Sequence, residues 1–379
     1  MFNLQEFIRE LEEITAIESG TGCIDEQTEV AKYFKAKFDA LGWITNLHDI
    51  GNETGPMLSC TNREAESYDL MMIGHIDTVF PRGMLEKNPF RIEDDKIYGL
   101  GVADMKQGAL MMYHIVKNLD KEVLDKLNIA VVFNPDEEIG SIYSRPAYKS
   151  IAEKSKYCYI YESGSRNGCR TIQRKGCFGL MAEFHGVEGH SGGMFTNGAK
   201  SAIHEMAHWI VEFNKLESRE RDITVNAGLA NGGKAINIVA DHASLGLGIR
   251  YFDISVKDEV AAKLKELEAH AAEKGITVTY TKNRFITPLV PSEEGRKYTE
   301  HALEVARGVD PDFYYSNPGS SGLSDGNQVA DLGPIVIDSL GPSGAKLHTE
   351  NEHLFIDRIE ISYKVSEVLI KDIAENKKL

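Results

Sequence analysis

The chain has 379 residues and a formal net charge of −16, with 42% hydrophobic and 26% charged residues. This length exceeds that of one typical domain core, so we expect two domains in a globular protein. The negative charge repels phosphate backbones and anionic lipid, which argues against nucleic-acid or membrane binding.

The N-terminal segment predicts an amphipathic helix, because Phe7, Leu11 and Ile14 fall near one helical face. This segment lacks the basic start and unbroken apolar run of a signal peptide. No stretch of the chain approaches the roughly 20 apolar residues of a membrane span. The five cysteines form no C-x-x-C pair, so we expect reduced thiols in a cytoplasmic protein.

Three apolar runs predict buried strands, and each ends at polar or acidic residues. They cover 69–74, 128–135 and 157–162, and a helical pattern over 108–119 separates the first two. Buried strands that alternate with helices predict an α/β domain with a mixed, mostly parallel sheet and helices on both faces. Ligands of such sheets bind beyond the carboxyl ends of the strands.

The middle of the chain has a different pattern, in which apolar and polar residues alternate along the predicted strands. The strand signals cover 180–184, 223–229, 244–251 and 277–281, and helix signals cover 200–216 and 256–274. The order β-α-β-β-α-β predicts a small α+β, ferredoxin-like domain. We therefore expect a catalytic domain in two pieces, 1–176 and 287–379, interrupted by a lid domain over 177–286.

Candidate metal ligands lie next to two of these elements. Residues i and i+2 of a strand point the same way, so His75 could bind a metal while Asp77 fixes its ring from behind. Asp104 lies in a glycine-flanked segment just before a helix, where a carboxylate could bridge two cations. Alone, Asp104 would be read as a helix N-cap, and H-x-D tripeptides are common.

Further acidic residues follow the second and third strands. In Asp136-Glu137-Glu138, adjacent carboxylates repel unless a cation or proton lies between them, so one glutamate could bind metal beside a general base. Glu162 ends the third strand and His348 lies in a late loop. Taken singly, these residues suit solvent-exposed loops equally well.

The ordered set is more specific than its members. It supplies two imidazoles and three carboxylates as ligands, from His75, Asp104, Glu138, Glu162 and His348, with Glu137 as the base. Nitrogen and oxygen ligands without thiolate suit zinc, with cobalt or manganese as substitutes.

This set resembles the M20 metallopeptidase family over essentially the whole chain, and within it the glutamate carboxypeptidase-like branch. The resemblance implies that one zinc is held by His75, Asp104 and Glu162. It implies that the other is held by Asp104, Glu138 and His348. Asp104 would bridge, Asp77 would support His75, and the peptide bond after Asp104 would be cis.

The resemblance also extends to residues of the middle segment and of a late loop. His190 matches a histidine that steadies the oxyanion, and Asn237 matches a substrate-contacting asparagine. Arg250 and Arg284 are candidate clamps for a substrate carboxylate, with surface ion pairs as the alternative. The loop that begins with Gly319 and Ser320 resembles one that wraps that carboxylate. The family also implies a homodimer formed through the lid.

The expected function is therefore zinc-dependent hydrolysis of an amide or peptide bond next to a free carboxylate. The substrate would be a small peptide with a carboxyl-terminal glutamate or, as the alternative, an N-acyl amino acid. Relatives with that second activity are acetylornithine deacetylases, succinyl-diaminopimelate desuccinylases and aminoacylases. Glu162 stands where di- and tripeptidases of the family carry aspartate, which favours the carboxypeptidase and deacylase branches.

Three other functions compete with this one. His204-Glu205-Met206-Ala207-His208 matches the H-E-x-x-H helix of zincin proteases, whose apolar face would bury Met206 and Ala207. The segment Gly189–Gly193 matches the G-x-S-x-G nucleophile elbow, although glycines and turn residues follow the serine instead of a helix. A non-catalytic protein that binds metal or an amino acid would be expected to lack the base or a ligand, and none is missing.

Overall fold

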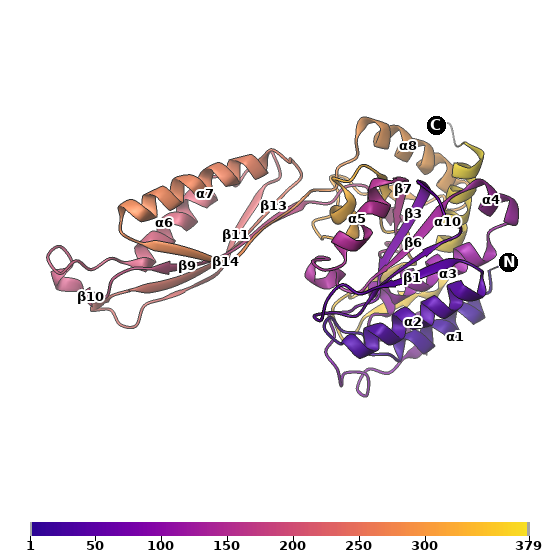
Figure 1. The fold of residues 1–379 in the computed structure, drawn as a ribbon, viewed down its shortest axis with the longest axis horizontal. Coiled ribbons are helices and arrows are strands. Elements are labelled where there is room, and N and C mark those ends of the chain that lie inside the picture. The colour runs from indigo at the N-terminus through magenta and orange to yellow at the C-terminus, as the bar shows by residue number, and fades with distance from the viewer. Residues whose placement is uncertain (1, 377–379) are drawn as a thin grey trace. The chain divides into compact units, whose positions relative to one another are not determined.

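The computed structural model describes residues 2–376 and divides the chain into two compact units (Figure 1). Unit 1 is formed by the residues up to Gln173 and from Val290 onward, and unit 2 by Arg174–Leu289. The predicted inserted segment, 177–286, falls inside unit 2. Within residues 2–376, every helix is too short or too polar to cross a membrane.

Unit 1 is built around a six-stranded mixed sheet, as predicted. The strands, in sheet order, are β1 (Ile44–His48), β2 (Met57–Thr61), β6 (Ile129–Asn134), β3 (Tyr68–His75), β7 (Ser155–Ile160) and β16 (Ile335–Ile337). The last four strands are mutually parallel, and β2 is antiparallel to both of its neighbours, β1 and β6. Every residue of β6 is buried, so this strand is covered on both faces.

Helices supply the cover on the sheet of unit 1. They are α1 (Leu4–Thr15), α2 (Ile24–Ala40), α3 (Gln107–Asn118), α4 (Lys121–Lys126), α5 (Arg145–Glu153), α8 (Glu293–Arg307), α9 (Asp325–Val329) and α10 (Ile356–Glu375). Helix α1 begins where Asn3 accepts a hydrogen bond from the Glu6 amide, and it buries Phe7, Leu11 and Ile14 as its pattern predicted.

Short strands complete unit 1. A small four-stranded sheet contains β17 (Gly344–Ala345), β18 (His353–Phe355), β5 (Lys96–Tyr98) and β4 (Arg91–Glu93), and β8 (Cys169–Arg170) pairs with β15 (Tyr314–Tyr315). The β17–β18 hairpin matters below, because its connecting loop carries His348.

Unit 2 has the predicted β-α-β-β-α-β order. Its antiparallel sheet has the order β11 (Thr224–Gly232), β13 (His242–Tyr251), β9 (Gly176–His185), β14 (Thr277–Ile286). Helices α6 (Ala202–Asn214) and α7 (Val256–Glu273) lie side by side along one face of this sheet (Figure 1). Alternate β9 residues, from Phe178 to Phe184, are buried in the core of unit 2, so the sheet has one covered and one open face. A pair of short strands, β10 (Gly189–His190) and β12 (Ile238–Val239), was not predicted.

The candidate site residues of unit 1 follow from where its parallel strands end. His75, the last residue of β3, pairs in register with Asn134, the last residue of β6. Glu137 therefore follows closely after the same sheet edge, and Glu162 follows the end of β7 at Ile160. Parallel strands end at one edge, so three segments far apart in sequence deliver their polar residues together.

Candidate metal centre

Asp104 lies between the two candidate histidine ligands. Its Oδ1 is 3.1 Å from Nε2 of His75, and its Oδ2 is 3.0 Å from Nε2 of His348. The two oxygens of one carboxylate thus face different imidazoles. This is the arrangement that a carboxylate shared by two cations requires.

Three glutamates close the cluster around these residues. Glu162 Oε1 lies 3.7 Å from His75 Nε2, and Glu138 Oε2 lies 3.4 Å from His348 Nε2. The ligand atoms of His75, Glu137 and Glu162 all lie within 4.8 Å of one another, as do those of His75, Asp104 and Glu138. The side chain of His348 is 55% exposed and that of Asp104 only 10%, so solvent reaches the cluster beside His348.

Asp77 positions two of the three site segments. Its backbone oxygen lies 3.0 Å from Nδ1 of His75, and its carboxylate Oδ1 lies 3.3 Å from the same atom. The carboxylate also accepts hydrogen bonds from the backbone amides of Glu137 and Glu138, at 3.2 and 3.3 Å. Asp77 therefore fixes the imidazole and also holds the turn η2 (Glu137–Ile139), a connection that the sequence did not predict.

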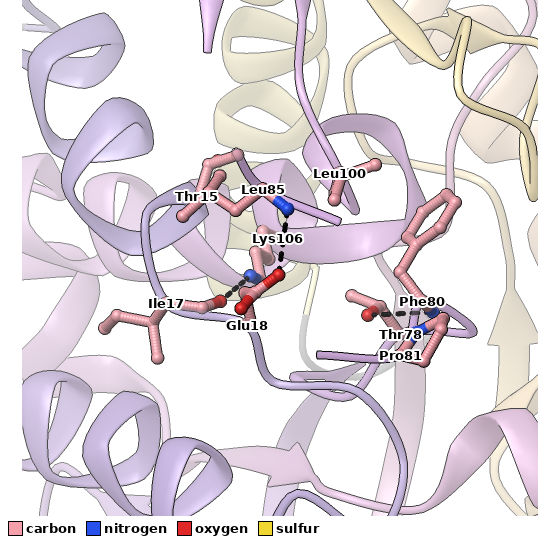
Figure 2. A pocket seen from close by; sticks show the side chains of 9 residues that line it. All are labelled: Thr15, Ile17, Glu18, Thr78, Phe80, Pro81, Leu85, Leu100 and Lys106. Atoms are coloured by element: carbon pink, nitrogen blue, oxygen red, sulfur yellow. Dashed lines mark hydrogen bonds between the residues drawn. The ribbon is translucent and has the colours of Figure 1, made fainter. Parts of the chain in front are cut away.

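The turn η1 (Val102–Lys106) carries Asp104, and its Asp104–Met105 peptide bond is cis. At the end of this turn the buried Lys106 ammonium donates to the carbonyl oxygen of Ile17 at 2.6 Å. Figure 2 shows Lys106 among the residues that line a small pocket, together with Glu18, whose carboxylate accepts from the Leu85 amide. Burial lowers the pKa of Lys106 to about 8.

The buried carboxylates of the cluster repel one another, and a bound cation would relieve this repulsion. Burial raises the pKa of Glu137 well above its usual range, and the charges of Glu162 and Glu138 raise it further. Burial likewise raises the pKa of Glu138 to about 7, although His75 opposes the shift. Five carboxylates, those of Asp77, Asp104, Glu137, Glu138 and Glu162, surround two imidazoles, so the protein alone does not balance the charge.

The donor set fits divalent metal ions. Glu138 Oε1 is buried and, among the described residues, has no hydrogen-bond partner, so this oxygen is available to bind a metal ion. Imidazole nitrogen and carboxylate oxygen are the ligands that zinc takes when thiolates are absent. His75, Asp104 and Glu162 could hold one ion, and Asp104, Glu138 and His348 a second.

Four predicted site residues belong to unit 2, and two of them, His190 and Asn237, lie together. The Ser191 amide donates to the Asn237 carbonyl at 3.0 Å, beside the β10–β12 pairing that contains His190. Nδ1 of His190 accepts from the Gly192 amide at 3.2 Å, so a neutral ring carries its proton on Nε2. The His190 side chain is exposed, and this N–H donor is therefore open to a ligand.

The two predicted arginines lie on strands of unit 2. Arg250 is on β13, half-buried, and its Nη1 is buried without a hydrogen-bond partner among the described residues. Arg284 is on β14, opposite Gly179 of β9. The unpaired N–H of Arg250 makes it the better-supported of the two candidate carboxylate clamps.

The remaining predicted residues, Gly319 and Ser320, lie beside Gln173 at the end of the first part of unit 1. The Ser320 amide donates to the Gln173 carbonyl at 2.9 Å. Gly319 has a φ of 127°, and a Cβ there would lie 2.6 Å from the Gln173 oxygen, so only glycine fits. The loop is thus fixed against the end of that segment.

Two supporting residues were not found from the sequence. Thr21 donates to Asp77 Oδ2 at 2.8 Å. Asp325, buried at the start of α9, accepts from Asn134 Nδ2 at 2.7 Å and from Ser141 Oγ at 2.8 Å. Asn134 in turn accepts from the Asp136 amide at 3.0 Å, so this network holds the segment that leads to Glu137. Asp325 ends the segment 319–325 that was expected to wrap the substrate carboxylate. Its supporting role and that of Thr21 could not be predicted, because their partners are distant in sequence.

The H-E-x-x-H segment of unit 2 is a structural element. Glu205 is 3% exposed and accepts from Nε1 of Trp209 and Nδ1 of His270, each at 3.0 Å. The interpretation that Ala207 belongs to the buried stripe is wrong, because Glu205 is buried and Ala207 is exposed. In the part of the chain that the structure describes, the clusters able to share a metal contain neither His204 nor His208.

Replacing Glu205 by glutamine should leave hydrolysis unchanged and lower the stability of unit 2. The amide is a weaker acceptor for its two donors, of which Trp209 is buried, so we expect a loss of about 1–2 kcal/mol in the free energy of unfolding. Urea unfolding and a rate assay on the same preparation measure both quantities. A large loss of rate without loss of folded protein would place the chemistry on this helix.

The G-x-S-x-G segment does not form a nucleophile elbow. Ser191 opens the short helical turn η3 (Ser191–Gly193), and the next α-helix begins only at Ala202. An elbow requires the serine to stand on a strand that turns directly into a helix. This geometry excludes that assignment.

Comparison with known proteins gives one family. The profile of peptidase family M20/M25/M40 matches residues 71–372. The carboxypeptidase G2 of a Pseudomonas species is 27% identical, covering 98% of this chain and 90% of that protein. The succinyl-diaminopimelate desuccinylase of Acinetobacter baylyi is 26% identical, covering 79% of this chain and 82% of that protein.

Solved structures show the same fold. The aminopeptidase PepT of Bacillus cereus superimposes with a TM-score of 0.77 at 23% identity, covering 98% of this chain and 99% of that one. An M20 family metallo-carboxypeptidase of Sulfolobus solfataricus superimposes with a TM-score of 0.73 at 18% identity, covering 98% and 99%. At these identities the similarity concerns the fold.

Proposed function

The chain belongs to peptidase family M20/M25/M40, and from that premise we propose that it is a two-zinc hydrolase of amide bonds next to a free carboxylate. Release of a carboxyl-terminal glutamate is the proposed reaction, and deacylation of N-acyl amino acids is the second candidate. The observation that carries the proposal is Asp104, whose two oxygens face His75 and His348 within a ring of three glutamates.

Both candidate reactions have support from the relatives. The carboxypeptidase G2 of Pseudomonas is similar over nearly the whole chain, which favours the first. The desuccinylase of Acinetobacter baylyi is similar over a shorter part, which keeps the second in view. In either case the substrate carries a carboxylate, which the guanidinium of Arg250 could bind through two parallel hydrogen bonds.

Glu137 is the proposed general base. When bound, the two metal ions would supply positive charge that polarises the scissile carbonyl and makes water more acidic. A carboxylate oxygen of Glu137 takes the proton of the attacking water and then gives it to the leaving amine. Asp77 serves this step by holding the Glu137 and Glu138 amides, which fixes the base relative to His75.

Unit 2 supplies the proposed substrate contacts. His190 presents an exposed Nε2–H donor, which suits stabilisation of a developing oxyanion. Asn237 lies beside it and could bind a polar group of the substrate. We also propose that unit 2 joins two chains in a homodimer and that the protein acts in the cytoplasm. The edge strand β11, with Leu229 55% exposed, supports such a contact.

A matched pair of substrates tests this function. Zinc-loaded protein should release glutamate from peptides that end in a free glutamate, and amidation of that α-carboxyl group should abolish or strongly reduce the reaction. N-acetyl and N-succinyl amino acids form the second arm of the panel. Equal hydrolysis of free and amidated peptides, or no hydrolysis in either arm, would contradict the proposal.

A further inference from the structure

The peptide unit that precedes Asp104 is held from two sides by side chains. The amides of Ala103 and Asp104 both donate to Oε1 of Glu352, at 2.8 and 3.0 Å. The Ala103 carbonyl accepts from Ser163 Oγ at 2.6 Å and from Gln107 Nε2 at 3.1 Å. Glu352 is 1% exposed, so these bonds are shielded from competing water.

The two side chains come from segments that also carry candidate ligands. Ser163 follows Glu162, and Glu352 ends the loop of the β17–β18 hairpin, whose middle carries His348. A Cβ on Gly344 of this hairpin would lie 2.3 Å from the Ala103 Cβ, so the hairpin packs directly on η1. One peptide unit is therefore the meeting point of the Asp104, Glu162 and His348 segments.

The loop that carries His348 needs such an anchor. His348 has a φ of 61° and Lys346 a φ of 59°, a left-handed conformation that costs free energy for residues other than glycine. The His348 side chain is also far more exposed than that of Asp104, which it contacts. The Glu352 hydrogen bonds dock the buried end of this loop on the turn that it serves.

The other end of η1 is anchored independently. Lys106 donates to the Ile17 carbonyl, and both residues line the pocket in Figure 2, so the turn is fixed after Asp104 as well as before it. These anchors hold the backbone on both sides of Asp104, from which its carboxylate reaches both imidazoles. Small displacements of a bridging carboxylate change both metal sites at once.

We infer that Glu352 and Ser163 are positioning residues that form a clamp on the Ala103 peptide and so hold Asp104 between the two metal sites. Neither side chain is a ligand in this assignment. Their effect passes through backbone groups, in the manner of the outer hydrogen bonds that orient metal ligands in other proteins. The inference rests on the proposed two-metal function.

The test compares full-length Glu352→Ala, Glu352→Gln, Ser163→Ala and, as a control on the same loop, Glu350→Ala, whose residue is exposed. Zinc affinity is measured by competition with a chromophoric chelator, beside kcat, KM and the melting temperature. Glu352→Ala should weaken zinc binding about 10- to 100-fold and lower kcat with little change in KM. Glu352→Gln should recover most of this loss, because its amide oxygen can accept the same two N–H bonds.

The outcomes separate the clamp from the function on which it rests. Wild-type protein that binds no zinc refutes the proposed function and the clamp together. If wild type binds two ions, wild-type zinc affinity in Glu352→Ala overturns the clamp alone, as does a glutamine variant as defective as the alanine variant. Should Glu352→Ala fail to fold, Ser163→Ala decides: reduced zinc affinity supports the clamp, and unchanged affinity overturns it.

Discussion

Glu137→Gln should bind metal like the wild type and lose about 10²- to 10⁴-fold in kcat, the usual contribution of a general base. The substitution keeps the shape of the side chain and the backbone bonds of its turn to Asp77. An amide cannot take a proton from water, so the chemical step is lost while the cluster keeps its other groups. Zinc analysis and steady-state kinetics on one preparation measure both effects.

The matched control for this variant is Glu205→Gln, which makes the same chemical change at a buried glutamate of unit 2. It should keep both metal and rate. Near-normal activity in Glu137→Gln would refute its role as base. A dead Glu137→Gln that has also lost its zinc would instead show that Glu137 is a ligand.

Asp104→Asn should lose both metal ions, because Asp104 is in contact with both imidazoles of the cluster. Loss of one of the other ligands should mainly weaken the site to which it belongs. We therefore expect a fall in zinc affinity greater than the roughly 100-fold that loss of an outer-shell partner can cause. Activity should fall below detection at zinc concentrations that saturate the wild type.

Asp258→Asn is a suitable control, because it removes the same charge from an exposed position at the start of α7. Chelator competition gives the affinities, and circular dichroism shows that each variant is folded. Retention of one tightly bound zinc by Asp104→Asn would contradict the shared carboxylate. It would favour two independent sites, or a single one.

Much of the fold and of the site could be predicted because the signals are local. The apolar runs that became β3 and β6 are buried strands whose ends carry His75 and the segment of Glu137. Parallel strands end at one edge, so the order of these residues in the chain already predicted their proximity. The alternation of apolar and polar residues along the strands of unit 2 likewise predicted its sheet, because one face of that sheet is covered and the other is open.

The supporting residues could not be predicted, because their partners are backbone groups or side chains far away in sequence. Glu352 binds the amides of Ala103 and Asp104, and nothing in its own neighbourhood indicates this. The buried stripe of α6 was also misjudged, because Glu205 is buried there and hydrogen-bonds His270 of another helix. Periodicity reports which residues share a face, and it does not report what packs against them.

The zinc content of the full-length wild-type protein, measured after exhaustive dialysis against metal-free buffer, tests the central claim most directly. The shared carboxylate of Asp104 predicts about two tightly bound ions per chain, as in two-metal hydrolases. A protein that retains about two ions, and regains hydrolysis in step with them after chelation and reloading, agrees with this account. A protein that hydrolyses its substrates at full rate with no bound metal, or that saturates at a single ion, contradicts it.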